Sequence, residues 1–192
     1  MHDVSQESRN SVQLLEQIAQ LQGEVARLEE KVVELDRLAH LDALVPIANR
    51  RGMLRELETM IARHERHDIP AAVLFVDLDG LKLLNDRLGH EGGDAALIHV
   101  AQQLLVGVRA GDCVARVGGD EFCILLDHAD EASAIETAER LVNLVADNEF
   151  LFEGGPMPLS VAIGLTLVQR GDTPGAVLAR ADQAMYRVKV AA

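Results

Sequence analysis

A heptad repeat of apolar residues near the N-terminus constrains this chain more than any other feature of its sequence. Leucine recurs at every seventh position, and a second apolar series with the same period lies between the leucines. The two series are Leu14, Leu21, Leu28 and Leu35, and Ile18, Val25, Val32 and Ala39. Alternating spacings of four and three are typical of a coiled coil, and β-branched residues at a with leucine at d favour two parallel strands. We therefore predict a parallel dimeric coiled coil over residues 1–40; the alternative is an amphipathic helix that packs on its own domain.

The charges that flank this repeat support dimerisation only in part. Lys31 at a g position can pair with Asp36 at an e position of a second helix, whereas Glu24 and Glu29 face each other as like charges. We expect a homodimer that is weak when this helix acts alone.

The composition allows one compact domain beside the helix and argues against several classes of partner. The chain has 192 residues, of which 48% are hydrophobic and 26% charged, a balance usual for globular proteins. Its net charge of −13 repels nucleic acid and anionic membrane surfaces. The N-terminus is polar, and the apolar runs are far shorter than the ~20 residues of a membrane span. We therefore expect a soluble cytoplasmic protein with no membrane segment.

A second domain is predicted over residues 41–192, because the composition changes after His40 and Pro46 should interrupt the helix. Apolar periodicity predicts helices and strands that alternate along this part of the chain. The expected helices cover residues 50–66, 81–88, 92–108, 130–147 and 174–190, and the expected strands 71–79, 112–117, 121–127 and 158–168. This order predicts an α/β (α+β) fold with a central mixed sheet flanked by helices. On helix 130–147, the apolar face is expected to include Ile135.

Two cysteines flank the Gly118-Gly119 pair, which is predicted to form the turn of a hairpin. If Val117 pairs with Asp120, Cys113 and Cys123 face opposite sides of the sheet. We therefore expect reduced thiols and no disulfide.

Carboxylates gather at the ends of two predicted strands. Asp77 and Asp79 end one strand, with Leu78 between them, so both acids are expected on one face with the Leu78 carbonyl nearby. Asp120 and Glu121 begin another strand, directly after the two glycines. Like charges gathered at one sheet edge would repel each other unless a hard cation such as Mg²⁺ neutralises them.

Three segments resemble the family of GGDEF-type diguanylate cyclases. The run Arg116-Val-Gly-Gly-Asp-Glu-Phe122 matches the family signature letter for letter, and residues 77–94 (DLDGLKLLNDRLGHEGGD) and 181–189 (ADQAMYRVK) are similar to two further family motifs. The resemblance implies a palm-like core shared with nucleotidyl cyclases. The implied reaction joins two GTP molecules into cyclic di-3′,5′-GMP and releases two pyrophosphates.

The same resemblance implies a role for each matching residue. The expected metal ligands, for two Mg²⁺ ions per site with Mn²⁺ as a possible substitute, are Asp77, Asp120, Glu121 and the carbonyl of Leu78. Residues expected to act in catalysis or on the phosphates are Asp120, Glu121, Lys82 and Lys189. Residues expected to bind the substrate, with the first two reading guanine, are Asn85, Asp94, Gly118, Gly119 and Leu81.

Arg109 and Asp112 resemble the family's R-x-x-D product-inhibition site, and Arg140 is a candidate third member. A guanidinium binds phosphate or guanine through two hydrogen bonds, which suits cyclic di-GMP. The alternative is a local surface ion pair. The product contains two guanylates, so two domains with one GTP each must meet, and the coiled coil would bring them together.

The sequence departs from the family pattern at three places, one of which is Leu81 in place of the usual aromatic residue before Lys82. Val45-Pro46-Ile47 replaces a T-G-L lead-in, and the given sequence stops at Ala192 without the usual G-R-N segment. Two other functions are considered: a non-catalytic receptor that binds cyclic di-GMP or GTP to regulate a partner, and a dimerisation module. The intact acidic cluster favours the cyclase, because a receptor would not need so many like charges.

Overall fold

The computed structural model describes the backbone of residues 2–153 and 155–191, and the side chains of this range from residue 17 onward except 19, 37 and 191. The chain separates into two compact units, Met1–Ala39 and His40–Ala192, each treated separately below. Leu14 of the heptad repeat lies outside the described side chains. In the described part of the chain, no helix is both long and apolar enough to cross a membrane.

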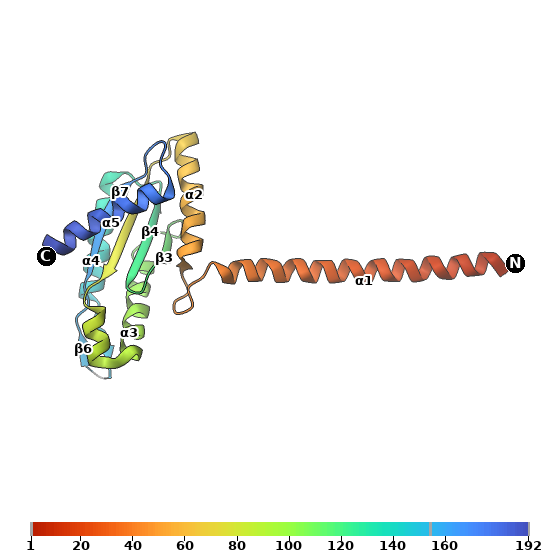
Figure 1. Cartoon of the computed structure of the whole chain (residues 1–192), viewed down its shortest axis with the longest axis horizontal. Coiled ribbons are helices and arrows are strands. Elements are labelled where there is room, and N and C mark those ends of the chain that lie inside the picture. Colours follow the sequence, from red (N-terminus) through yellow and green to blue (C-terminus); the bar gives the residue numbers. More distant parts are fainter. Residues whose placement is uncertain (1, 154, 192) are drawn as a thin grey trace. The chain divides into compact units, whose positions relative to one another are not determined.

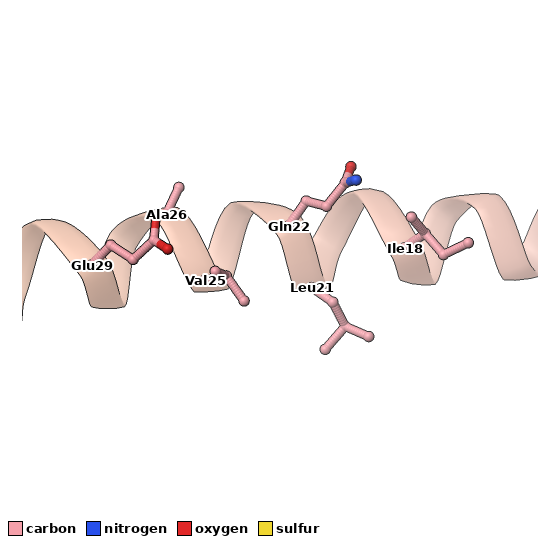
Figure 2. A pocket seen from close by; sticks show the side chains of 6 residues that line it. All are labelled: Ile18, Leu21, Gln22, Val25, Ala26 and Glu29. Atoms are coloured by element: carbon pink, nitrogen blue, oxygen red, sulfur yellow. The ribbon is translucent and has the colours of Figure 1, made fainter.

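The first unit is one uninterrupted helix, α1 (His2–Ala39), so the prediction of a helix at the heptad repeat is confirmed. Leu21 and Val25 extend from one side of α1, whereas Gln22 and Ala26 extend from the other (Figure 2). The apolar side chains of the stripe are exposed, with Leu21 at 60% and Val32 at 64%. The helix therefore carries an unshielded apolar stripe, and its pairing with a second copy stays a prediction.

The second unit is built on a mixed sheet, as predicted. In the described residues, five strands form this sheet in the order β1-β3-β4-β2-β7, with β1 parallel to β3 and the other neighbours antiparallel. The strands are β1 (Ala48–Asn49), β2 (Ala71–Leu78), β3 (Cys113–Arg116), β4 (Glu121–Asp127) and β7 (Val161–Leu167). The helices are α2 (Arg50–His67), α3 (Leu81–Val106), α4 (Glu131–Asp147) and α5 (Pro174–Ala191). Figure 1 shows these elements around the central strands.

The sheet separates two apolar cores. On one face, alternate residues of β2 and β4, such as Val76 and Phe122, pack against α3 and α4. On the other face, their neighbours Phe75 and Cys123 pack against α2 and α5. Every residue of β2 is buried, as expected for a central strand covered on both sides.

Helix α3 contains a break at Gly89, whose φ of 74° lies in the left-handed region. The predicted helices over 81–88 and 92–108 are the two halves on either side of this break. The break places the end of the first half beside the start of the second. Two residues that sequence reasoning assigned to one ligand, Asn85 and Asp94, come from these two halves.

The predicted register of the β3–β4 hairpin is wrong by one residue. Cys113 lies opposite Leu125 and Ala115 lies opposite Cys123, because Val117 donates its N–H to the carbonyl of Glu121 and the turn is longer than expected. A slip of one residue reverses the face of every side chain. Both cysteines therefore face α2 and α5, not opposite sides of the sheet. They are free thiols, and burial raises the pKa of Cys113 to about 11.

Several other features differ from the sequence prediction. A small hairpin of β5 (Phe150–Phe152) and β6 (Gly155–Met157) was not expected, and neither was the two-residue strand β1. Ile135 was placed on the apolar face of α4 but is 45% exposed, whereas Leu141 and Val145 are buried. Short strands give too few residues for a periodic signal, and one apolar residue on a helix surface is ordinary.

Candidate active site

The acidic residues from two distant motifs lie side by side at one end of the sheet. Asp77 on β2 pairs directly with Glu121 on β4, so both side chains lie on the face covered by α2 and α5. The N–H of Leu78 donates to the carbonyl of Asp120 at 3.0 Å, which fixes the turn beside the end of β2. The structure therefore brings together the residues that sequence reasoning assigned to a metal site.

Lys189 comes to this cluster from α5 and donates a hydrogen bond to the Asp77 carboxylate. The hydrogen bond to Asp77 raises the pKa of the Lys189 ammonium above its ordinary value. Asp77 is itself buried, with 8% of its surface exposed, and a buried carboxylate without a positive partner would be costly. Lys189 provides that charge.

The position of α5 depends on Gly164 in β7. A Cβ at this residue would collide with the backbone of Ala181 and Met185. Only glycine lets the helix backbone approach the strand so closely. This close packing of α5 on β7 positions Lys189 for its contact with Asp77. The contact was not predicted, because sequence gives no measure of the distance between a helix and a strand.

Glu121 lies among other acids and its pKa is raised. Burial is the largest cause, followed by the negative charges of Asp120, Asp77 and Asp182, while Arg50 opposes the shift. Arg50 at the start of α2 and Asp182 on α5 were not identified as site residues from the sequence. For Asp182, the available signal was its position inside the motif ADQAMYRVK. For Arg50, it was the segment Asn49-Arg50-Arg51, which follows the altered lead-in Val45-Pro46-Ile47.

The glycine turn is shaped by its own neighbours. A Cβ at Gly118 would collide with the Glu121 carboxylate. Arg116 donates to the carbonyl of Gly119 from Nε at 3.2 Å and from Nη2 at 2.8 Å, and it also lies 3.5 Å from the carboxylate of Asp42. Glu121 and Arg116 therefore both contact the turn, while Gly119 itself is exposed.

Asp79 does not join the acidic cluster as its neighbour Asp77 does. The strand ends at Leu78, and the Asp79 carboxylate accepts a hydrogen bond from Ser160 Oγ at 2.8 Å. The N–H of Asp79 also donates to the carbonyl of Ser160 at 2.9 Å. This double contact anchors the turn that leads from β2 into α3.

The expected substrate-binding residues on α3 lie on both sides of its break. The Asn85 side chain lies against Gly93, so closely that a Cβ there would overlap it, and Asp94 is the next residue. Leu81 is half-buried, and Lys82 is exposed in the first turn of α3. The structure thus brings Asn85 and the region of Asp94 together and leaves Lys82 accessible at the β2 end.

A second group of expected residues lies at the opposite end of the hairpin. The Asp112 carboxylate accepts from the backbone N–H of Arg109 at 2.9 Å and of Asp127 at 3.2 Å. Arg140 on α4 donates to the carbonyl of Gly107 from Nη2 at 2.9 Å. The guanidinium of Arg109 is left exposed beside them. The three residues therefore belong to one region of the surface.

The donor set at the acidic cluster fits a hard divalent cation that shares its ligands with a substrate. Carboxylate and carbonyl oxygens are the ligands that Mg²⁺ prefers, and Mg²⁺ commonly binds through one or two carboxylates plus phosphate oxygens. Among the described residues, no three carboxylate, thiol or imidazole groups by themselves surround a possible metal position. Asp77, Asp120 and Glu121 therefore fit a metal whose shell is completed by other oxygens.

Comparison with protein families agrees with this arrangement. Residues 39–192 match the family model described as "Diguanylate cyclase, GGDEF domain". The chain belongs to the GGDEF family. The GGDEF match covers the whole second unit and includes the acidic cluster, Lys189 and the Arg109 region.

Two curated relatives show how this GGDEF chain compares in sequence. It is 37% identical over 172 residues to the diguanylate cyclase TpbB of Pseudomonas aeruginosa, covering 88% of this chain and 40% of the relative. It is 36% identical over 155 residues to the response regulator PleD of Caulobacter vibrioides, covering 79% of this chain and 34% of the relative. The chain thus spans well under half of the length of these relatives.

A solved structure with a similar fold is that of the coiled coil and GGDEF domain of DgcB from Caulobacter crescentus in complex with c-di-GMP. The TM-score is 0.85 at 26% sequence identity, and the match covers 93% of this chain and 95% of that one. The mixed α+β fold of the GGDEF family is therefore shown for this chain.

Proposed function

We propose that this chain is a diguanylate cyclase that condenses two GTP molecules into cyclic di-3′,5′-GMP and releases two pyrophosphates. The observation that carries the proposal is the meeting of Asp77, Asp120 and Glu121 at one sheet edge in a member of the GGDEF family. The relative TpbB bears the name of this activity. GTP is a cytoplasmic nucleotide, and we place the reaction in the cytoplasm.

The residues of the cluster divide the work of binding and reaction. Two Mg²⁺ ions, or Mn²⁺ in their place, would be held by Asp77, Asp120, Glu121 and the carbonyl of Leu78, and would neutralise the triphosphate and polarise the reacting phosphorus. Lys189 and Lys82 would bind phosphate oxygens. Asn85 and Asp94 would read guanine, since a carboxylate accepts from its N–H groups and an amide can meet its carbonyl. The exposed turn at Gly118 and Gly119, with Leu81, would border the nucleotide.

The product requires two such sites facing each other, one GTP in each domain. We propose that α1 pairs with α1 of a second copy through its exposed apolar stripe. Pairing raises the effective concentration of the second domain, so the two halves meet more often than free domains would.

Cyclic di-GMP is also proposed to inhibit the enzyme at Arg109, Asp112 and Arg140. Support comes from the exposed guanidinium of Arg109 beside a carboxylate and a second arginine in one region. The solved complex of DgcB with c-di-GMP shows that a member of the family binds this nucleotide.

The proposed activity is tested by incubating the full chain with GTP and Mg²⁺ and separating the nucleotides by chromatography. We expect cyclic di-GMP and pyrophosphate in a ratio of one to two. The variant Asp120→Asn should form no product without loss of thermal stability, because it removes a charged ligand and relieves repulsion but keeps the side-chain shape. Binding of cyclic di-GMP without turnover in the wild type would instead identify a receptor. Retained turnover in Asp120→Asn, within a few fold, would contradict the metal-ligand assignment.

A further inference from the structure

A cavity lies between α2 and α5 on the face of the sheet that carries Glu121. Its volume is about 350 Å³. This value is at the lower end of the range of small-molecule pockets, roughly 300 to 1,000 Å³. It is lined by residues from α2, β2, the hairpin turn and α5, all within the second unit.

The lining of the cavity combines apolar side chains with charged ones. Met53 and Phe75 lie at the bottom, where both are buried in the core, and Leu178 covers one side. A thioether and an aromatic ring are favourable neighbours for a flat aromatic group. The buried part of the lining therefore suits a compact apolar body.

Three charged residues lie at the rim: Arg50, Glu121 and Asp182. One positive and two negative side chains leave a formal charge of −1 around the opening. Lys189 does not supply the missing positive charge, because it is hydrogen-bonded to Asp77. The rim therefore attracts a cation and repels an anion such as a free nucleotide.

We propose that this cavity binds small aromatic cations, molecules with a flat apolar body and one amidinium or ammonium group. The body lies against Met53 and Phe75, and the cationic group donates hydrogen bonds to Glu121 and Asp182. The residues proposed to read guanine lie on α3, the helix that packs on the opposite face of the sheet. The inference goes beyond the proposed cyclase activity. The cavity shares Glu121 with the proposed metal site, so its binding is tested without Mg²⁺.

Benzamidine is the probe that tests this site, with neutral benzamide as its matched control. Binding is followed by amide chemical shifts of the isotope-labelled full chain. We expect saturable shifts at Leu178 and Ala179, with a dissociation constant on the order of millimolar for so small a molecule. Benzamide should bind at least several fold more weakly. Because turnover is not measured, the result is the same whether or not the chain proves to be a cyclase.

Two variants locate the binding. Ala179 is an exposed lining residue, so Ala179→Phe should fill the cavity and weaken benzamidine binding by tenfold or more. Ala176→Phe, at another exposed position of the same helix, is the control and should bind as the wild type does. Asp182→Asn should weaken binding about fivefold, the effect of losing one exposed ion pair. Absence of saturable shifts at α5, equal binding of benzamide, or unchanged binding in Ala179→Phe would each overturn the proposal.

Discussion

At the scale of single residues, the cluster holds more negative charge than its own side chains neutralise. Asp77 is paired with Lys189, but Glu121 faces Asp120, Asp77 and Asp182 with only Arg50 opposing them. An arrangement of this kind lowers the stability of the free protein and favours the binding of cations. We therefore expect the cluster to lower the folding stability of the ligand-free protein and to raise its affinity for cations.

Replacing Glu121 by glutamine should measure this loss. The pKa of Glu121 in the folded chain lies above its ordinary value of 4.5, so ionisation is less favourable in the folded than in the unfolded state. The folded state therefore favours the protonated form of Glu121. The stability that this preference contributes is fully present below pH 4.5 and is lost as the pH rises through the folded pKa. Glu121→Gln should therefore raise the melting temperature at pH 7, without metal, and the gain should shrink below pH 4.5.

The matched control for this measurement is Glu58→Gln, at an exposed position on α2. It changes the net charge by the same amount without altering the cluster. If both variants gain stability equally at pH 7, the effect comes from the overall charge of the chain and not from the surroundings of Glu121.

Sequence reasoning located most of the cluster but not its surroundings. Asp77, Asp120 and Glu121 stand out because acids follow an apolar strand and a Gly-Gly turn. Arg50 and Asp182 do not, because each is an ordinary surface residue of a helix until the sheet brings it to Glu121. The turn length was also missed, because the residues of a hairpin loop do not by themselves say whether one more residue stays unpaired. The two cysteines were therefore expected on opposite faces, whereas they lie on the same face.

At the scale of elements, the contact between α5 and β7 sets the position of Lys189. Gly164 lies directly beneath the backbone of α5. Helix α5 and strand β7 were both predicted from periodicity. The distance between them was not predicted, because it depends on the missing side chain of Gly164. A methyl group there must push α5 outward, which loosens the core around Val177 and Ala181.

The variant Gly164→Ala should lower stability by about 1 to 3 kcal/mol, the usual range for overpacking a core. The shift of α5 should also weaken GTP binding, because Lys189 moves from the cluster. Urea unfolding and GTP titration measure the two effects. Gly175→Ala on α5, where a Cβ meets nothing within 4 Å, is the control and should leave both values near those of the wild type. Equal behaviour of the two variants would show that α5 tolerates a methyl group at the strand.

At the scale of the whole molecule, two compact units are present, and the apolar stripe of α1 is exposed on the single chain. Exposed leucine and valine at heptad spacing are what a coiled coil buries on pairing. If α1 supplies proximity and not chemistry, its removal should leave the catalytic residues intact but separate the domains.

Removal of residues 1–40 should give a folded monomer whose specific activity is low at dilute protein and rises with protein concentration. Leu28→Asp in the full chain should act in the same way, because it places a charge in the stripe without shortening the chain. Activity assays over a hundredfold range of concentration, with light scattering for mass, make the comparison. Specific activity that is unchanged and independent of concentration would contradict the dimer proposal.

The proposed feedback inhibition also belongs to the scale of the whole molecule, because its proposed site lies away from the acidic cluster. Arg109 and Asp112 precede β3, at the end of the hairpin opposite to Gly118 and Gly119. Product bound there cannot occupy the position of GTP, so it must act by holding domains in an unproductive arrangement. Inhibition should then persist when GTP is raised.

The variant Arg109→Ala removes the exposed guanidinium and should weaken binding of cyclic di-GMP by about a hundredfold, the effect of losing a two-bond contact to a charged group. Its initial rate should match that of the wild type, because no residue of the acidic cluster is changed. Progress curves of the wild type should slow as product accumulates, at low and at high GTP, whereas those of Arg109→Ala should remain linear for longer. Arg66→Ala, at an exposed position at the end of α2, is the control and should slow as the wild type does. Equal curvature in all three proteins, or relief of inhibition by excess GTP, would place the inhibiting product in the active site instead.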